Sequence, residues 1–88
     1  MVVARHAVDI LEQARRSPAN VRFADLRRLV EALGYTLRRQ EGSHHVFTHV
    51  VHPALPMINL QSDGAIPKPY QVRQVLRLIE ENELKVKS

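Results

Sequence analysis

The chain contains no cysteine among its 88 residues. Disulfide bonds, thiolate zinc sites and cysteine nucleophiles are therefore excluded, and we expect a fold held by packing alone in a reducing, cytoplasmic setting. No stretch approaches the ~18 apolar residues that a membrane span needs. The N-terminal residues reach Arg5 and His6 too early for the apolar region of a signal peptide. We therefore expect a soluble protein with no membrane partner.

Glycine and aromatic residues are also few, and no repeat or low-complexity tract interrupts the chain. With 88 residues, of which 44% are hydrophobic, the chain fits one small domain over residues 1–88 with a single core. The formal net charge of +4 favours a polyanionic partner and supports a role in binding nucleic acid.

Three segments have the apolar spacing of helices. From residue 7 to 14 apolar side chains recur at i, i+3, i+4 and i+7, and this helix should end before Pro18. A second stripe covers residues 23–33, and Gly34 is placed to cap it in a left-handed conformation. A third stripe covers residues 72–79 and predicts a C-terminal helix.

Between the second and third helices the period changes to that of strands. Residues 35–40 alternate, with Tyr35, Leu37 and Arg39 on one face and the other three residues on the opposite face. A turn at residues 41–43 joins this strand to residues 44–51, and residues 57–61 predict a third, shorter strand.

The predicted class is α+β, in the order α-α-β-β-β-α, with an antiparallel three-stranded sheet covered on one face by helices. The other face is then free for a partner. The alternation puts His44 and His45 on opposite faces of their strand, but the apolar residues around them do not decide which face is solvated.

The stretch Gly42-Ser43-His44-His45 lies where the turn enters the second strand, and Arg38 and Arg39 precede it. Imidazoles beside fixed positive charge suit acid/base chemistry on a phosphate-containing substrate such as RNA. A neutral imidazole can take the proton of a ribose 2′-hydroxyl, a cation can stabilise the phosphate oxygens, and this scheme requires no metal. A glycine in the turn would let the backbone approach the phosphate.

Several motifs resemble the HicA toxins of bacterial and archaeal toxin-antitoxin systems over residues 22–84, which leaves residues 1–21 as an N-terminal helical extension. The motifs that carry the resemblance are Phe23-Ala24-Asp25-Leu26, Leu33-Gly34-Tyr35, Arg38-Arg39, Gly42-Ser43-His44-His45-Val46-Phe47, His49, Asn59-Leu60-Gln61 and Lys68-Pro69-Tyr70-Gln71-Val72-Arg73-Gln74-Val75-Leu76.

The resemblance implies a fold like a double-stranded-RNA-binding domain. It also implies an endoribonuclease that cuts mRNA without a metal or other cofactor, and that a HicB antitoxin neutralises. The chain would then form a hetero-oligomer with the antitoxin or a homo-oligomer. The family's catalytic histidine follows the glycine-serine pair, which maps to His44.

Other residues near His44 have no role carried over so directly. Gly42, Ser43 and His45 are auxiliary candidates. We expect Arg38, Arg39 and Lys68 to contact RNA.

Alternatives remain open at this point. His44 and His45 are also compatible with ordinary polar positions at a strand edge. The chain could be an RNA-binding module of the same fold that does not cut, or a protein whose basic face docks an acidic chain. A zinc site shared by histidines spaced along a strand is disfavoured by their separation. Asn59 and Gln61 are weak candidates for RNA or partner contacts.

Overall fold

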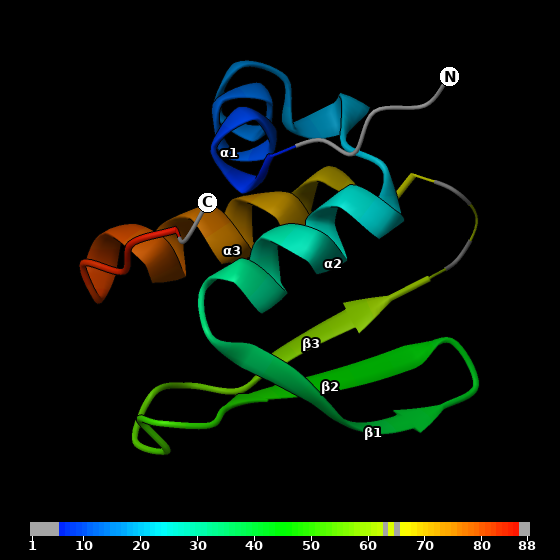
Figure 1. Ribbon diagram of the computed structural model, residues 1–88. Coiled ribbons are helices and arrows are strands. Elements are labelled where there is room, and N and C mark those ends of the chain that lie inside the picture. The colour runs from blue at the N-terminus through cyan, green and yellow to red at the C-terminus, as the bar shows by residue number, and fades with distance from the viewer. Residues whose placement is uncertain (1–5, 63, 65, 87–88) are drawn as a thin grey trace.

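The computed structural model describes residues 6–62, 64 and 66–86. The elements in chain order are α1 (Ala7–Arg16), the short 3₁₀ helix η1 (Pro18–Asn20), α2 (Phe23–Ala32), β1 (Tyr35–Glu41), β2 (His44–His49), β3 (Ile58–Gln61) and α3 (Pro69–Glu81), shown in Figure 1. The predicted α+β class and element order are confirmed. No helix in the described residues is long and apolar enough to cross a membrane. The segment before His6, which bears on the signal-peptide expectation, lies outside them.

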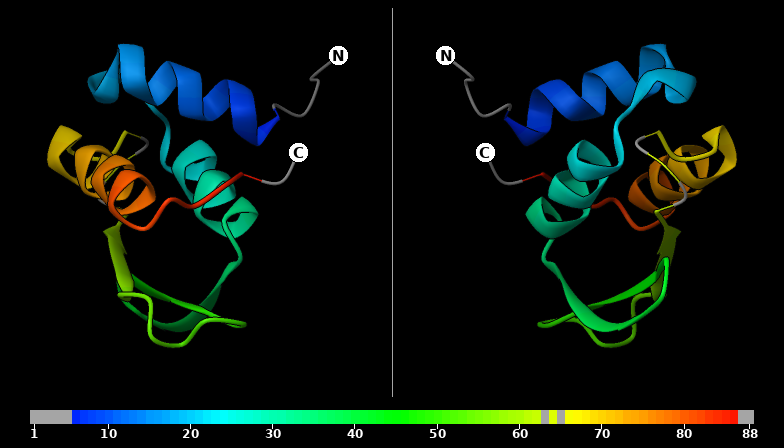
Figure 2. Two further views of the ribbon diagram at one scale, coloured as in Figure 1. Left: turned by 90° about the vertical axis from the view of Figure 1, so that its left-hand side faces the viewer. Right: turned by 90° about the vertical axis from the view of Figure 1, so that its right-hand side faces the viewer.

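The three strands form one antiparallel sheet in the order β1-β2-β3. Helices α2 and α3 lie against one face of this sheet, and α1 lies across both helices on the side away from it (Figures 1 and 2). The opposite face of the sheet, which we call the open face, is covered by no element of the described chain. This is the arrangement that the resemblance implied for the core.

Apolar side chains from α1, α2, α3 and all three strands form one core, which fills the space between the sheet and α2 and α3 and continues beneath α1. The fully buried members of this core with the largest side chains are Tyr35, Phe47, Ile10, Leu26, Leu29, Ile58, Leu60, Val21, Val30, Val72 and Val75. The apolar stripes on α1, α2 and α3 all contribute to this core, so the helical spacing of apolar residues in the sequence correctly predicts which helix faces are buried.

The ends of the first two helices follow the sequence signals. Helix α1 ends at Arg16, where the backbone N–H of Ser17 still bonds to the Gln13 carbonyl at 2.8 Å before Pro18 starts η1. Helix α2 is followed by Gly34 at φ +100°, the left-handed conformation expected of a glycine after a helix.

Strand β2 ends at His49, two residues earlier than predicted. The reason is local: the His49 side chain accepts the backbone N–H of His52 through Nδ1 at 3.0 Å, which turns the chain out of the ladder. Val50 and Val51 therefore lie beyond the strand and are 65% and 72% exposed. Likewise β3 begins at Ile58 rather than at residue 57.

The strict alternation predicted for residues 35–40 is wrong beyond Leu37. Leu37 pairs with Phe47, but the next pair along the ladder is Arg39 with Val46, so Arg38 is the extra residue of a β-bulge. The bulge shifts the phase of β1 by one residue. Arg39 therefore shares the open face with Val46 instead of sharing a face with Leu37.

Candidate functional site

His44 is the first residue of β2 and is exposed on the open face of the sheet. It lies opposite Glu41 of β1 on one side and Gln61 of β3 on the other. The side-chain nitrogen Nε2 of Gln61 is 3.4 Å from both ring nitrogens of His44. Because these two contacts are long and equal, neither imidazole nitrogen is held in a short hydrogen bond.

A shallow hollow of about 160 Å³ opens beside this imidazole. Three of its lining residues come from the sheet and three from the first two turns of α3; they are His44, Asn59, Gln61, Tyr70, Gln71 and Gln74. The hollow therefore brings together three residues that the sequence analysis named as candidates: His44, Asn59 and Gln61. The sequence analysis did not name the three residues of α3 as site residues.

Gln71 holds α3 against the end of β3. Its side chain is almost fully buried, at 3% exposure for the residue, and its Oε1 accepts the backbone N–H of Gln61 at 2.9 Å. That N–H points away from β2 and would otherwise be unpaired at the sheet edge. A signal was present in the sequence, because Gln71 lies next to Val72 and four residues before Val75, on the apolar stripe.

His45 lies on the other face of β2, toward the helices. It is 5% exposed, and its ring lies 5.1 Å from that of Phe23, centroid to centroid. Its Nδ1 is 3.0 Å from the Ser43 carbonyl, which can only accept, so Nδ1 carries the proton. The same carbonyl accepts the backbone N–H of Ser62 at 2.9 Å. His45 thus packs inside the domain and braces the turn that precedes His44.

Gly42 occupies the left-handed region at φ +56° at the tip of this turn. A side-chain carbon built on it would meet nothing within 4 Å, so the backbone of the turn is open to solvent. A ligand can approach this backbone closely.

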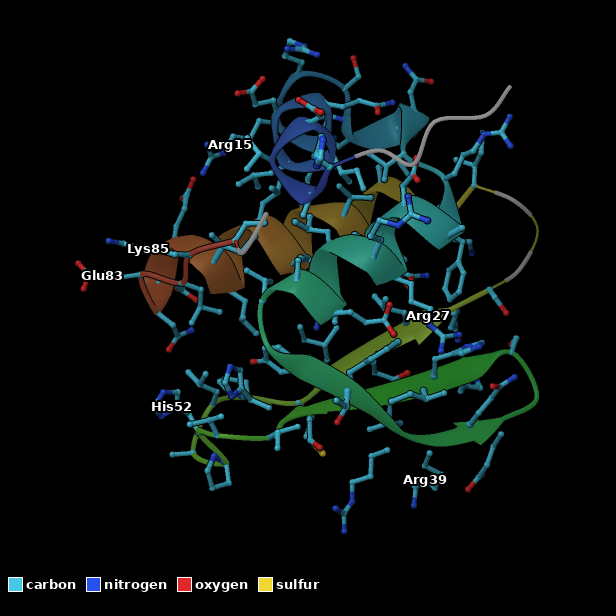
Figure 3. All side chains as sticks on the ribbon, viewed as in Figure 1. Arg15, Arg27, Arg39, His52, Glu83 and Lys85 are labelled. Carbon is cyan, nitrogen blue, oxygen red and sulfur yellow. The ribbon has the colours of Figure 1, made fainter. Side chains whose placement is uncertain are left out.

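Arg38 and Arg39 lie side by side along a second hollow, of about 340 Å³, together with Val46 and Met57. The bulge makes this possible, because it breaks the alternation that would separate neighbouring residues. Figure 3 shows Arg39 directed away from the helices. Its Nε lies 3.4 Å from a carboxylate oxygen of Glu41, and both side chains are well exposed.

Val46 pairs with Arg39 of β1 on one side and with Asn59 of β3 on the other. This row of three paired residues lies next to the row of Glu41, His44 and Gln61 on the open face. The structure therefore brings both arginines to the same face as His44. Lys68 is the exposed residue immediately before α3 and does not line the hollow beside His44.

Within residues 6–62, 64 and 66–86, no three His, Cys, Asp or Glu side chains gather closely enough to hold a metal ion. His49, which is 9% exposed, uses both ring nitrogens in hydrogen bonds to the backbone of Leu33 and His52. It is a buried structural residue of the helix-facing side.

The turn before β2 lies between the glycine-ended helix α2 and the C-terminal helix α3, and it presents the exposed His44. The family model described as the HicA toxin of bacterial toxin-antitoxin systems matches residues 23–80. The chain belongs to the HicA toxin family. The match runs from the start of α2 into α3 and leaves α1 and η1 outside. Comparisons with curated proteins and with solved structures give no match.

Proposed function

We propose that this HicA toxin is an endoribonuclease that cleaves mRNA without a metal ion, with His44 as the general base. The observation that carries the proposal is that the three histidines of β2 differ in exposure and in the face of the sheet on which they lie. His45 and His49 are buried on the helix-facing side, whereas His44 is exposed and lines a polar hollow where α3 meets the β3 edge of the sheet. A general base needs a ring nitrogen that the bound ribose can reach, and among these three histidines only the ring of His44 is exposed.

The proposed reaction uses that imidazole as the base. Neutral His44 accepts the proton of a ribose 2′-hydroxyl, and the 2′-oxygen forms a bond to the neighbouring phosphorus. The bond from phosphorus to the 5′-oxygen breaks, and that oxygen takes a proton from solvent. The products are a 2′,3′-cyclic phosphate and a 5′-hydroxyl end.

Binding and charge stabilisation come from the turn and from β1. Arg38 and Arg39 on the open face hold RNA phosphates one or more rows from His44. The open backbone at Gly42 lets amide hydrogens of the turn face the phosphate oxygens.

A HicB-type antitoxin would neutralise this activity by covering the open face. Two large apolar side chains that line a hollow together with Arg38 are exposed: Val50 at 65% and Met57 at 64%. A cluster of exposed apolar residues rimmed by charge is typical of a protein-binding surface. A partner seated there would also cover Arg38 and Arg39.

The test is cleavage of an unstructured RNA by the purified chain in the presence of EDTA. We expect cutting that leaves cyclic phosphate ends, and a loss of about 10²- to 10⁴-fold in the His44→Ala variant. His52→Ala is the matched control, because His52 is also an exposed histidine but does not line the hollow of His44.

Undiminished cutting by His44→Ala would reject the assignment of the base, and loss of cutting with EDTA would reject the metal-free scheme. Retention of RNA without any cutting would identify a non-catalytic RNA-binding module.

A further inference from the structure

Tyr70 is a large aromatic residue that the fold does not use for packing. It lies in the first turn of α3, is 55% exposed and lines the hollow beside His44. No other aromatic ring of the described chain lies against it in the way that Phe23 lies against His45. An exposed aromatic face in a polar hollow is available for stacking by a flat ligand.

Two amide side chains face the same hollow and form no hydrogen bond with any residue that the structure describes. Gln74 follows Tyr70 by four residues, so both lie on one face of α3, and Asn59 reaches the hollow from β3. No hydrogen bond within the described residues engages the amide of either Asn59 or Gln74. Each amide offers both donors and an acceptor.

The size and charge of the hollow restrict its ligand. Its volume of about 160 Å³ is well below the ~300–1,000 Å³ of sites for drug-sized ligands, and suits a single ring system. None of the six lining residues that the structure describes is an arginine, lysine, aspartate or glutamate. The fixed cations, Arg38 and Arg39, line the separate hollow on β1 and β2. A neutral, flat, polar group therefore fits here better than a phosphate.

We propose that this hollow binds one unpaired nucleobase of RNA, with Tyr70 stacking on its face and Asn59 and Gln74 bonding to its edge. The placement of this base next to the scissile phosphate rests on the proposed role of His44. Stacking on an aromatic side chain together with hydrogen bonds to the base edge is how proteins read single-stranded RNA. A base inside a duplex presents neither its face nor its pairing edge, so the hollow selects unpaired RNA.

Binding of RNA that cannot be cleaved tests the base site separately from catalysis. The probes are 2′-fluoro RNA hexamers, which lack the attacking hydroxyl, and a matched series in which one position at a time lacks its base. For the wild-type chain we expect removal of the base at one position to weaken binding by about 5- to 150-fold, the range for one stacked base.

The Tyr70→Ala variant should bind the intact hexamer as weakly as the wild type binds the probe without that base, and should no longer distinguish the two. Tyr70→Phe keeps the aromatic face and should retain the distinction. Ile66→Ala is the matched control, because Ile66 is 53% exposed but lies outside the hollow. Asn59→Ala and Gln74→Ala should reduce the preference among hexamers of different base composition.

Equal weakening at every position, or a Tyr70→Ala variant that keeps the distinction, would overturn the base site. So would a wild-type chain that binds none of the hexamers. If the wild-type chain distinguishes the intact hexamer from the probe without one base but does not cut natural RNA, the proposed catalysis fails and the base site stands. If the chain cuts natural RNA but binds both hexamers equally well, only the base site fails.

Discussion

The imidazole of His49 fills the space that a side chain at position 34 would need. A Cβ built on Gly34 would lie 2.5 Å from Nε2 of His49. That nitrogen is 3.0 Å from the Leu33 carbonyl and donates to it, while Nδ1 accepts the backbone N–H of His52. The ring also meets Tyr35 edge-on, with centroids 5.1 Å apart. One buried histidine thus ties the end of α2 to the end of β2.

The first prediction follows from this contact. Gly34→Ala should lower the free energy of unfolding by roughly 2–4 kcal/mol, because it combines a left-handed backbone at φ +100° with a clash against a bonded ring. Urea denaturation measures it. Gly64→Ala is the control: Gly64 has a similar φ of +91° but open space around it, so only about 1–2 kcal/mol of backbone strain applies. Equal losses in the two variants would contradict the contact.

His45→Ala should lower folding stability without abolishing cleavage. We expect it to lose about 1–3 kcal/mol of folding stability, because it removes a buried ring packed on Phe23 and a hydrogen bond to Ser43. The folded fraction should keep most of its cleavage rate. His44→Ala should show the reverse pattern, with stability within about 0.5 kcal/mol of wild type. Thermal denaturation together with single-turnover cleavage checks both. A stable but inactive His45→Ala would instead make His45 part of the catalysis.

Gln71→Leu should loosen the junction between α3 and β3. It leaves the part-buried N–H of Gln61 without its acceptor, at a cost of about 1–3 kcal/mol. Amide hydrogen exchange at Gln61 should speed up more than exchange in the rest of the sheet. Gln74→Leu provides the comparison, since Gln74 is exposed on the same helix and should change stability by less than about 0.5 kcal/mol. Unchanged exchange at Gln61 in the Gln71 variant would show that this hydrogen bond is unimportant.

Removing positive charge from the bulge should weaken RNA binding and its salt dependence. Each of Arg38→Gln and Arg39→Gln should reduce the slope of log K against log salt by about 0.7 if the arginine contacts one phosphate of a single strand. Glu41→Gln should strengthen binding, because Glu41 pairs with Arg39 at 3.4 Å. Arg15→Gln, on α1 far from the open face (Figure 3), should leave the slope unchanged. A slope unaffected by either bulge variant would place the RNA elsewhere.

Stability should fall at alkaline pH through Tyr35. Burial raises the pKa of its phenol above the ordinary value of 10.0, and its hydroxyl donates to the Pro56 carbonyl at 2.9 Å. The native chain therefore holds this proton to higher pH than the unfolded chain, so the free energy of unfolding decreases as pH rises above about 10. Urea titrations between pH 8 and 11 should show a steeper decline for wild type than for Tyr35→Phe. Parallel declines would remove Tyr35 as the cause.

Much of the fold could be predicted because its signals are local. The apolar spacing in α1, α2 and α3 corresponds to the buried stripes, and Pro18 and Gly34 lie where the first two helices stop. These features depend on the conformational limits of single residues and on helix period, which a sequence displays directly.

The faces of the sheet depend on contacts between segments. Along β2 the apolar residues were balanced between the two faces, and only packing against the helices buried Phe47 instead of Val46. The bulge at Arg38 exists only in the pairing of β1 with β2, so a pattern within β1 could not reveal it.

The sequence by itself determined the elements, their order and the family, and its glycine-serine-histidine turn singled out His44. Tertiary structure decided which neighbours surround that imidazole. Gln71 and Tyr70 lie more than twenty residues from His44 along the chain and reach it through the docking of α3 on the edge of β3. Such proximity arises from the burial of side chains distant in sequence, which no local pattern of residues records.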